Sequence, residues 1–106
     1  MEEKNSTDVF FKVLEYKERY LYIPKKLIWD KEGFEEVSYG RFIADKLARL
    51  IADNEDEDYT IIFNEVINQV DTYTHKGSWE SKKMFAIMKN TLESIFYYVN
   101  NPLPYY

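Results

Sequence analysis

The feature that most constrains the fold is the spacing of apolar residues between Tyr59 and Tyr73. In this segment they recur every three or four positions, at Tyr59, Ile62, Phe63, Val66, Ile67, Val70 and Tyr73. This period places them on one face of an α-helix, whereas a half-buried strand would alternate at every second residue. The segment therefore predicts an amphipathic helix over about 59–74 whose apolar face packs against another element.

Three further segments show the same periodicity. The first, over about 8–21, carries Phe10, Phe11, Leu14 and Leu21, with Val13 and Tyr20 on the flank. The second, over about 38–53, has one narrow face of small and branched residues, namely Gly40, Ile43, Ala44, Leu47, Leu50 and Ile51. The last, over about 78–100, carries Met84, Phe85, Met88, Leu92, Ile95, Phe96 and Val99. Four amphipathic helices with short connections predict an all-α, four-helix bundle-like single domain spanning residues 1–106.

Polar and helix-breaking residues indicate where these helices begin and end. Ser38, Asp58 and Ser78 are each placed to cap the helix that follows, because their side chains accept hydrogen bonds from its first free N–H groups. Pro24 ends the first helix, since its ring disfavours helical geometry in the preceding residue. Between the first and second predicted helices, the residues from Asp30 to Gly33 resemble a turn. The segment of about 22–37 is therefore expected to be a short hairpin or an ordered loop.

The composition excludes several classes of chemistry. A chain of 106 residues is long enough for one self-sufficient core, and it has no cysteine for a disulfide or a thiolate metal site. We expect neither a transmembrane span nor a signal peptide, hence a cytoplasmic protein. The single His75 lacks a second ligand or a base partner, and the serines lack a nucleophile-elbow context. We therefore expect no enzyme activity and no cofactor.

Negative charge is concentrated in one stretch. The net charge is −5, and the stretch from Ala52 to Thr60 contains five acids, Asp53, Glu55, Asp56, Glu57 and Asp58. The chain has no stripe of Lys and Arg, so direct binding to nucleic acid is not expected. A helix N-terminus favours one or two nearby carboxylates. Five exceed that need, which points either to a solvated turn or to electrostatic recognition of a basic partner.

The same stretch also resembles part of a calcium-binding loop. Asn54, Asp56, Asp58 and Glu65 have the spacing of positions 1, 3, 5 and 12 of an EF-hand. Position 6 of that loop requires glycine, whereas here it is Tyr59, which the helical pattern places in the core. We therefore assign no metal ligands, and a metal- or ligand-binding helical domain stays as an alternative.

Two large aromatic residues lie on the predicted polar face of the last helix. Trp79 and Tyr97 fall nearly opposite its apolar face, and exposed aromatics of this size are enriched at protein interfaces. Alternatively, Trp79 folds onto the preceding loop and the C-terminal segment covers Tyr97. Together with the five acids, these two residues are the candidate partner-binding residues.

A resemblance to a known class of domains also indicates a role in binding another protein. Tyr39-Gly40, Phe42, Phe63-Asn64-Glu65 and Leu92-Glu93 resemble positions in small all-helical bacterial domains, some of which look like immunity proteins encoded beside toxins. The resemblance covers about residues 38–99 and departs in the N-terminal third.

The leading hypothesis is a non-catalytic interaction module, a small inhibitor or immunity-type protein that blocks a protein partner such as a basic toxin or nuclease. An alternative is a phage-type inhibitor of a nucleic-acid-binding machine that acts by local phosphate mimicry. That version is weaker, because a mimic normally spreads its charge along a groove. A homo-oligomer is compatible with every version.

Overall fold

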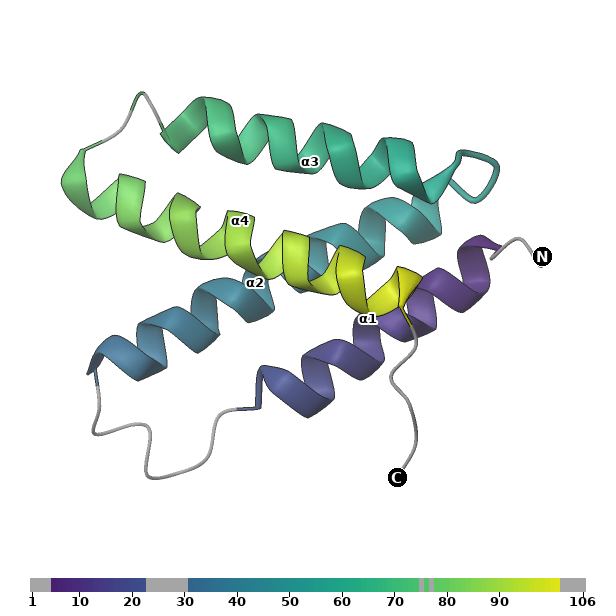
Figure 1. Ribbon diagram of the computed structural model, residues 1–106, viewed down its shortest axis with the longest axis horizontal. Helices are drawn as coiled ribbons and strands as arrows, with labels where there is room; N and C mark the ends of the chain where they lie inside the picture. Colours follow the sequence, from purple (N-terminus) through teal and green to yellow (C-terminus); the bar gives the residue numbers. More distant parts are fainter. Residues whose placement is uncertain (1–4, 23–30, 75, 77, 102–106) are drawn as a thin grey trace.

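The computed structural model describes residues 5–22, 31–74, 76 and 78–101, and these form four helices (Figure 1). Helix α1 is Ser6–Tyr20, α2 is Lys31–Asp53, α3 is Tyr59–Thr74 and α4 is Trp79–Asn100. The described residues contain no strand. The prediction of an all-α, four-helix bundle-like fold is confirmed. Within the described ranges, no helix is both long enough and apolar enough to cross a membrane.

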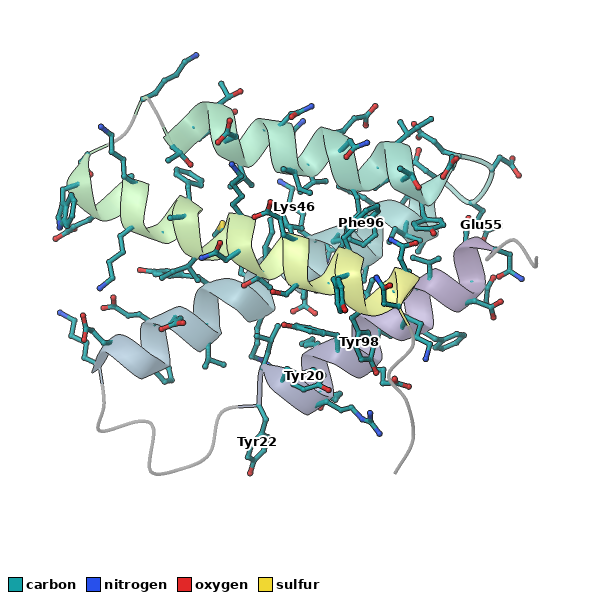
Figure 2. The ribbon with its side chains drawn as sticks, viewed as in Figure 1. Tyr20, Tyr22, Lys46, Glu55, Phe96 and Tyr98 are labelled. Carbon is teal, nitrogen blue, oxygen red and sulfur yellow. The ribbon has the colours of Figure 1, made fainter. Side chains whose placement is uncertain are left out.

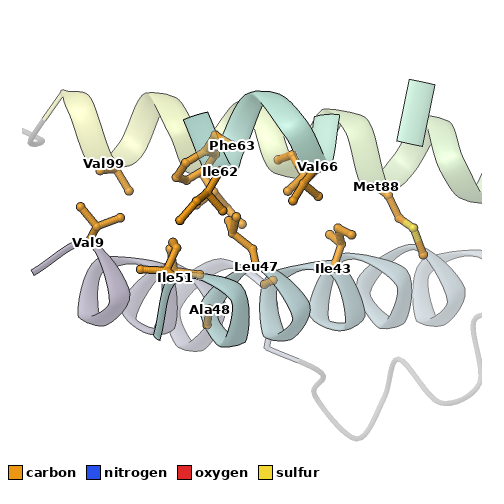
Figure 3. Packing of buried hydrophobic residues seen from close by; sticks show 14 of the residues in the cluster. Val9, Ile43, Leu47, Ala48, Ile51, Ile62, Phe63, Val66, Met88 and Val99 are labelled. Carbon is orange, nitrogen blue, oxygen red and sulfur yellow. The ribbon is translucent and has the colours of Figure 1, made fainter. Parts of the chain in front are cut away.

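The helices form two antiparallel pairs, α1 with α2 and α3 with α4, which pack face to face (Figure 1). Their buried side chains point toward each other from the two layers (Figure 3). The largest fully buried side chains are Phe63, Leu47, Ile51, Leu92, Ile95, Val9, Val13 and Val99. Since all four helices contribute to this set, the core is shared by the whole molecule and no pair of helices is complete without the other.

Helix α1 turns a different face to the core from the one expected. Val9 and Val13 are fully buried, whereas Phe11 is 61% exposed. Phe10 and Leu14 lie partly buried at the edge of the core. The prediction that Phe11 belongs to the apolar face is therefore wrong. Short β-branched residues four positions apart let α1 lie close against its neighbours, and the bulkier phenylalanines are left at the rim.

Helix α2 begins seven residues earlier than predicted. It starts at Lys31, so Gly33 and Ser38 lie inside the helix, and the expected hairpin or loop is wrong from residue 31 onward. The rest of that segment, 23–30, lies outside the described residues. Glycine inside a helix lowers its stability by about 1 kcal/mol relative to alanine, and tertiary contacts outweigh this cost. Val37 packs against the core, and Lys83 of α4 forms a 3.3 Å ion pair with Glu32.

The remaining helix boundaries agree closely with the sequence. The side chain of Asn5 caps α1, and that of Ser78 caps α4 as predicted. Asp58 accepts a 2.8 Å hydrogen bond from the Thr60 N–H in the first turn of α3, also as predicted. Helix α3 ends at Thr74, the end that the apolar pattern over about 59–74 predicted.

At Gly40, helix α2 lies close to its neighbours. A Cβ atom at this position would lie 3.0 Å from Cδ2 of Leu21 and 3.2 Å from Oγ1 of Thr91. The absence of a side chain at Gly40 therefore permits the close approach of Leu21 and Thr91.

Candidate functional site

The five clustered acids form a tight turn between α2 and α3, which we call the acidic turn, Asp53–Asp58. Backbone hydrogen bonds from Asn54 N–H to Ile51 O and from Glu57 N–H to Asn54 O, 3.3 and 3.0 Å long, hold it in shape. Glu57 is half-buried, and the other four carboxylates are exposed. The turn therefore presents a compact group of negative charges on a well-defined backbone.

These five carboxylates make no ion pair with the part of the chain that the structure describes. The described ion pairs lie elsewhere, including Lys17 with Asp45 and Lys83 with Glu32. The last turns of α2 and α4, which end near the acidic turn, contain no basic residue. Asp53 even stands at the C-terminus of α2, where the helix dipole disfavours a carboxylate. Among the five side chains, only that of Asp58 makes a hydrogen bond within the described chain, as the cap of α3.

An apolar hollow adjoins the acidic turn. The hydroxyl of Ser6 donates a 2.6 Å hydrogen bond to the carbonyl oxygen of Glu55, which fixes the start of α1 against the turn. Beside this contact lies a hollow of about 240 Å³, lined among others by Phe10, Phe11 and Ala52. Sequence reasoning missed this hollow because it assigned Phe11 to the core. No pattern in the sequence would have corrected this assignment, because only the tertiary packing shows that Val9 and Val13 are the buried residues.

The two aromatic candidates do not lie together. Trp79 is 81% exposed in the first turn of α4, at the opposite end of the molecule from the acidic turn (Figure 1). Tyr97 is 64% exposed near the other end of the same helix. A rise of 1.5 Å per residue separates the two positions by about 27 Å along the axis. Trp79 and Tyr97 therefore belong to different surfaces.

Tyr97 lies at the same end of the bundle as the acidic turn. Asn100, one turn further along α4, accepts a 2.6 Å hydrogen bond from the hydroxyl of Tyr59, the residue that follows the turn. Tyr97 also borders a wide, shallow hollow shared with Tyr16, Tyr20 and Tyr98. The structure thus places six of the seven candidate residues at one end and leaves Trp79 at the other.

A tyrosine cluster joins α1 to α4, which sequence reasoning did not foresee. Tyr98 is buried, its hydroxyl donates to the Glu15 carboxylate, and its ring makes edge contacts with Tyr16 and Tyr20 (Figure 2). Burial and the Glu15 hydrogen bond raise the pKa of Tyr98 to about 12. The Tyr98 hydrogen bond in turn lowers the pKa of Glu15. Both groups stay in their ordinary forms at pH 7, which suits a structural contact.

A larger apolar groove lies between α2, α3 and α4. Its volume is about 370 Å³, and its lining includes Phe42 from α2, Tyr73 from α3 and Met84 from α4. Phe42 and Tyr73 are both largely exposed. Helical periodicity cannot reveal this groove, because it arises where three helices diverge.

The structure does not support the calcium-loop spacing. Among the described residues there is no group of three or more His, Cys, Asp or Glu side chains arranged to hold a metal ion. Asp58 caps α3, and Tyr59 packs against the core as the helical pattern required.

Comparisons with protein-family models, with curated proteins and with solved structures give no match. The resemblance to immunity-like domains therefore gains no support from them, and the functional argument rests on the geometry above.

Proposed function

We propose that this chain is a non-catalytic protein–protein interaction module, a small inhibitor or immunity-type protein that binds and blocks a basic protein partner. The binding surface is the acidic end, which we define as the acidic turn together with the hollow at Phe10 and Phe11. The observation that carries the proposal is a group of five carboxylates that form no ion pair with the described residues and lie beside an exposed apolar hollow.

The energetics of the turn support a role beyond folding. A carboxylate near a helix N-terminus gains about 0.3–1 kcal/mol, but this benefit falls to Asp58, while Asp53 faces the unfavourable end of α2. Like charges held this close also repel one another. A cationic surface of a partner would relieve this repulsion, and the four acids other than Asp58 have no described ion pair or side-chain hydrogen bond to lose.

The acidic end combines two elements that a binding surface needs. Clustered charge attracts an oppositely charged partner over long range and raises the association rate. An apolar side chain of the partner that enters the hollow beside Phe11 would supply affinity, since buried apolar contacts dominate binding energy at interfaces. The expected partner is thus a protein with a basic cleft and an apolar residue at its edge, such as a toxin or a nuclease.

Tyr97 extends this surface on the same end of the bundle, whereas Trp79 lies too far away to contact the same small epitope. A partner that covers about 800 Å² on this side would reach the acidic turn and Tyr97 together.

The test compares four immobilised proteins in capture from bacterial lysate at low and moderate salt. The first is the unmodified chain, and the second has Asn at 53, 56 and 58 and Gln at 55 and 57. The third, a matched control, has Gln at five exposed acids that take part in no described ion pair, Glu18, Glu36, Glu65, Glu80 and Glu93. The fourth carries Phe11→Ser. Captured proteins are identified, purified and measured by direct titration.

We expect the unmodified chain and the control to bind one basic protein in a salt-sensitive manner. The second and fourth variants should lose at least tenfold in affinity. If the control loses as much as the second variant, net charge alone explains the binding and the site is wrong. If all four proteins bind alike, the acidic end is not the binding surface. A partner that itself binds nucleic acid would favour phosphate mimicry.

A further inference from the structure

The groove between α2, α3 and α4 has a composition unlike that of the acidic end. It has a volume of about 370 Å³, within the range of small-ligand sites, and its lining is predominantly apolar. Two of its residues are Met84 and Met88, whose flexible side chains adapt to the shape of a ligand. Met88 itself lies at the junction of the two helix layers (Figure 3).

Among the described side chains that line this groove, Lys46 is the one charged residue. Lys46, labelled in Figure 2, is exposed. Within the described part of the chain it takes part in no ion pair. The neighbouring Asp45 is already engaged by Lys17 at 2.7 Å. A cation that pairs with no described carboxylate therefore lies at this apolar groove, in a protein whose net charge is −5.

We propose that this groove binds a small apolar carboxylate, of the class of medium-chain fatty acids. The hydrocarbon chain lies among Phe42, Met84 and Met88, where it is removed from water, and the carboxylate pairs with the ammonium of Lys46. Burial of the chain supplies the affinity, at about 0.8 kcal/mol per methylene fully removed from water. The charge-assisted contact with Lys46 selects the acid over a neutral or cationic head group. This site is separate from the acidic end, so the test of ligand binding is independent of the proposed protein partner.

Methyl NMR provides a direct test. The chain has only three methionines, Met1, Met84 and Met88, so selective ¹³C labelling of the methyl groups gives two signals in the groove and one reference. The unmodified protein is titrated with decanoate, decanol and decyltrimethylammonium below their micelle concentrations. These probes share one chain length and differ in the charge of the head group. We expect saturable shifts of Met84 and Met88 with decanoate, weaker binding of decanol and the weakest binding of the cation.

Two variants separate the role of Lys46 from general charge effects. Lys46→Gln should weaken decanoate about tenfold and leave decanol unchanged, while Lys82→Gln, at another exposed lysine without a described ion pair, should alter neither. Both positions are exposed, so both variants should keep the fold.

Three results would overturn the proposal. The first is an absence of saturable shifts at Met84 and Met88 with decanoate. The second is equal binding of decanoate and decanol that Lys46→Gln does not change. The third is a shift of Met1 as large as the others together with a falling melting temperature, which would indicate detergent-like unfolding. If decanoate fails and the same two signals shift as the protein concentration rises, the groove belongs to a second copy of the chain.

Discussion

The two aspartates that bound the acidic turn should affect stability with opposite signs. Asp53 is the last residue of α2, where its carboxylate faces the negative end of the helix dipole. Asp53→Asn should therefore raise the free energy of unfolding by about 0.3–1 kcal/mol. Asp58 accepts a 2.8 Å hydrogen bond from the Thr60 N–H. Asp58→Ala should therefore lower the free energy of unfolding by about 1 kcal/mol, as the loss of other N-caps does. Asp58→Asn retains an acceptor and should be nearly neutral.

These free energies translate into measurable shifts of the melting temperature. An unfolding entropy of about 2.1 cal/mol/K per residue gives roughly 0.22 kcal/mol/K for a chain of 106 residues. Asp53→Asn should therefore raise the melting temperature by about 1–5 °C, and Asp58→Ala should lower it by about 5 °C. Thermal unfolding followed by far-UV circular dichroism measures both. In 1 M NaCl, where the Debye length is about 3 Å, the gain from Asp53→Asn should nearly vanish, whereas the loss from Asp58→Ala should persist.

One result would refute this reasoning. If Asp53→Asn destabilises the protein at low salt, the carboxylate makes a favourable local contact that the dipole argument ignores. The acidic turn would then stabilise the fold directly, and its charge would no longer indicate a binding role. A gain that salt leaves unchanged would likewise show that its origin is not electrostatic.

Three further predictions concern the packing of α1, α2 and α4. Gly40→Leu should destabilise the fold by about 1–3 kcal/mol in urea unfolding, because its side chain must displace Leu21 and Thr91; an unchanged midpoint would contradict the close approach. Tyr98→Phe should lower the free energy of unfolding by about 1–2 kcal/mol, because it removes the hydrogen bond to Glu15. This is the lower part of the range for hydrogen bonds to a carboxylate, since the side chain of Glu15 is 43% exposed and water weakens the interaction. The raised pKa of Tyr98, about 12, predicts that its contribution is fully present below about pH 10 and is lost as the pH rises toward 12. Alkaline unfolding of Tyr98→Phe beside the unmodified chain checks this, since the variant should be less sensitive over that window.

The positions of the helices could be predicted from the sequence, because helix periodicity and capping depend only on residues that are near one another in the chain. The three- and four-residue spacing of apolar side chains predicted four helices, and α3 was predicted with the bounds that it has, Tyr59–Thr74. Asp58 and Ser78 were recognised as caps because a cap needs only its own side chain and the next few N–H groups.

The errors arose where tertiary contacts outweigh local preference. Gly33 is a turn former by propensity, yet it lies inside α2 because Val37 packs against the core. In α1, phenylalanine and valine are both apolar, so the pattern alone could not say which face turns inward. Only the close packing of α1 on its neighbours decided that Val9 and Val13 are buried and Phe11 is exposed.

By itself, the sequence determined the fold class, most helix ends and the position of the acidic turn, because each depends on residues that are near one another in the chain. Only the tertiary structure decided which surfaces exist. It set the hollow of Phe11 beside the acidic turn and left an apolar groove in whose described lining Lys46 is the single charged residue. Each of these joins residues from two or three helices, and their proximity depends on how the helices pack, which no local pattern encodes.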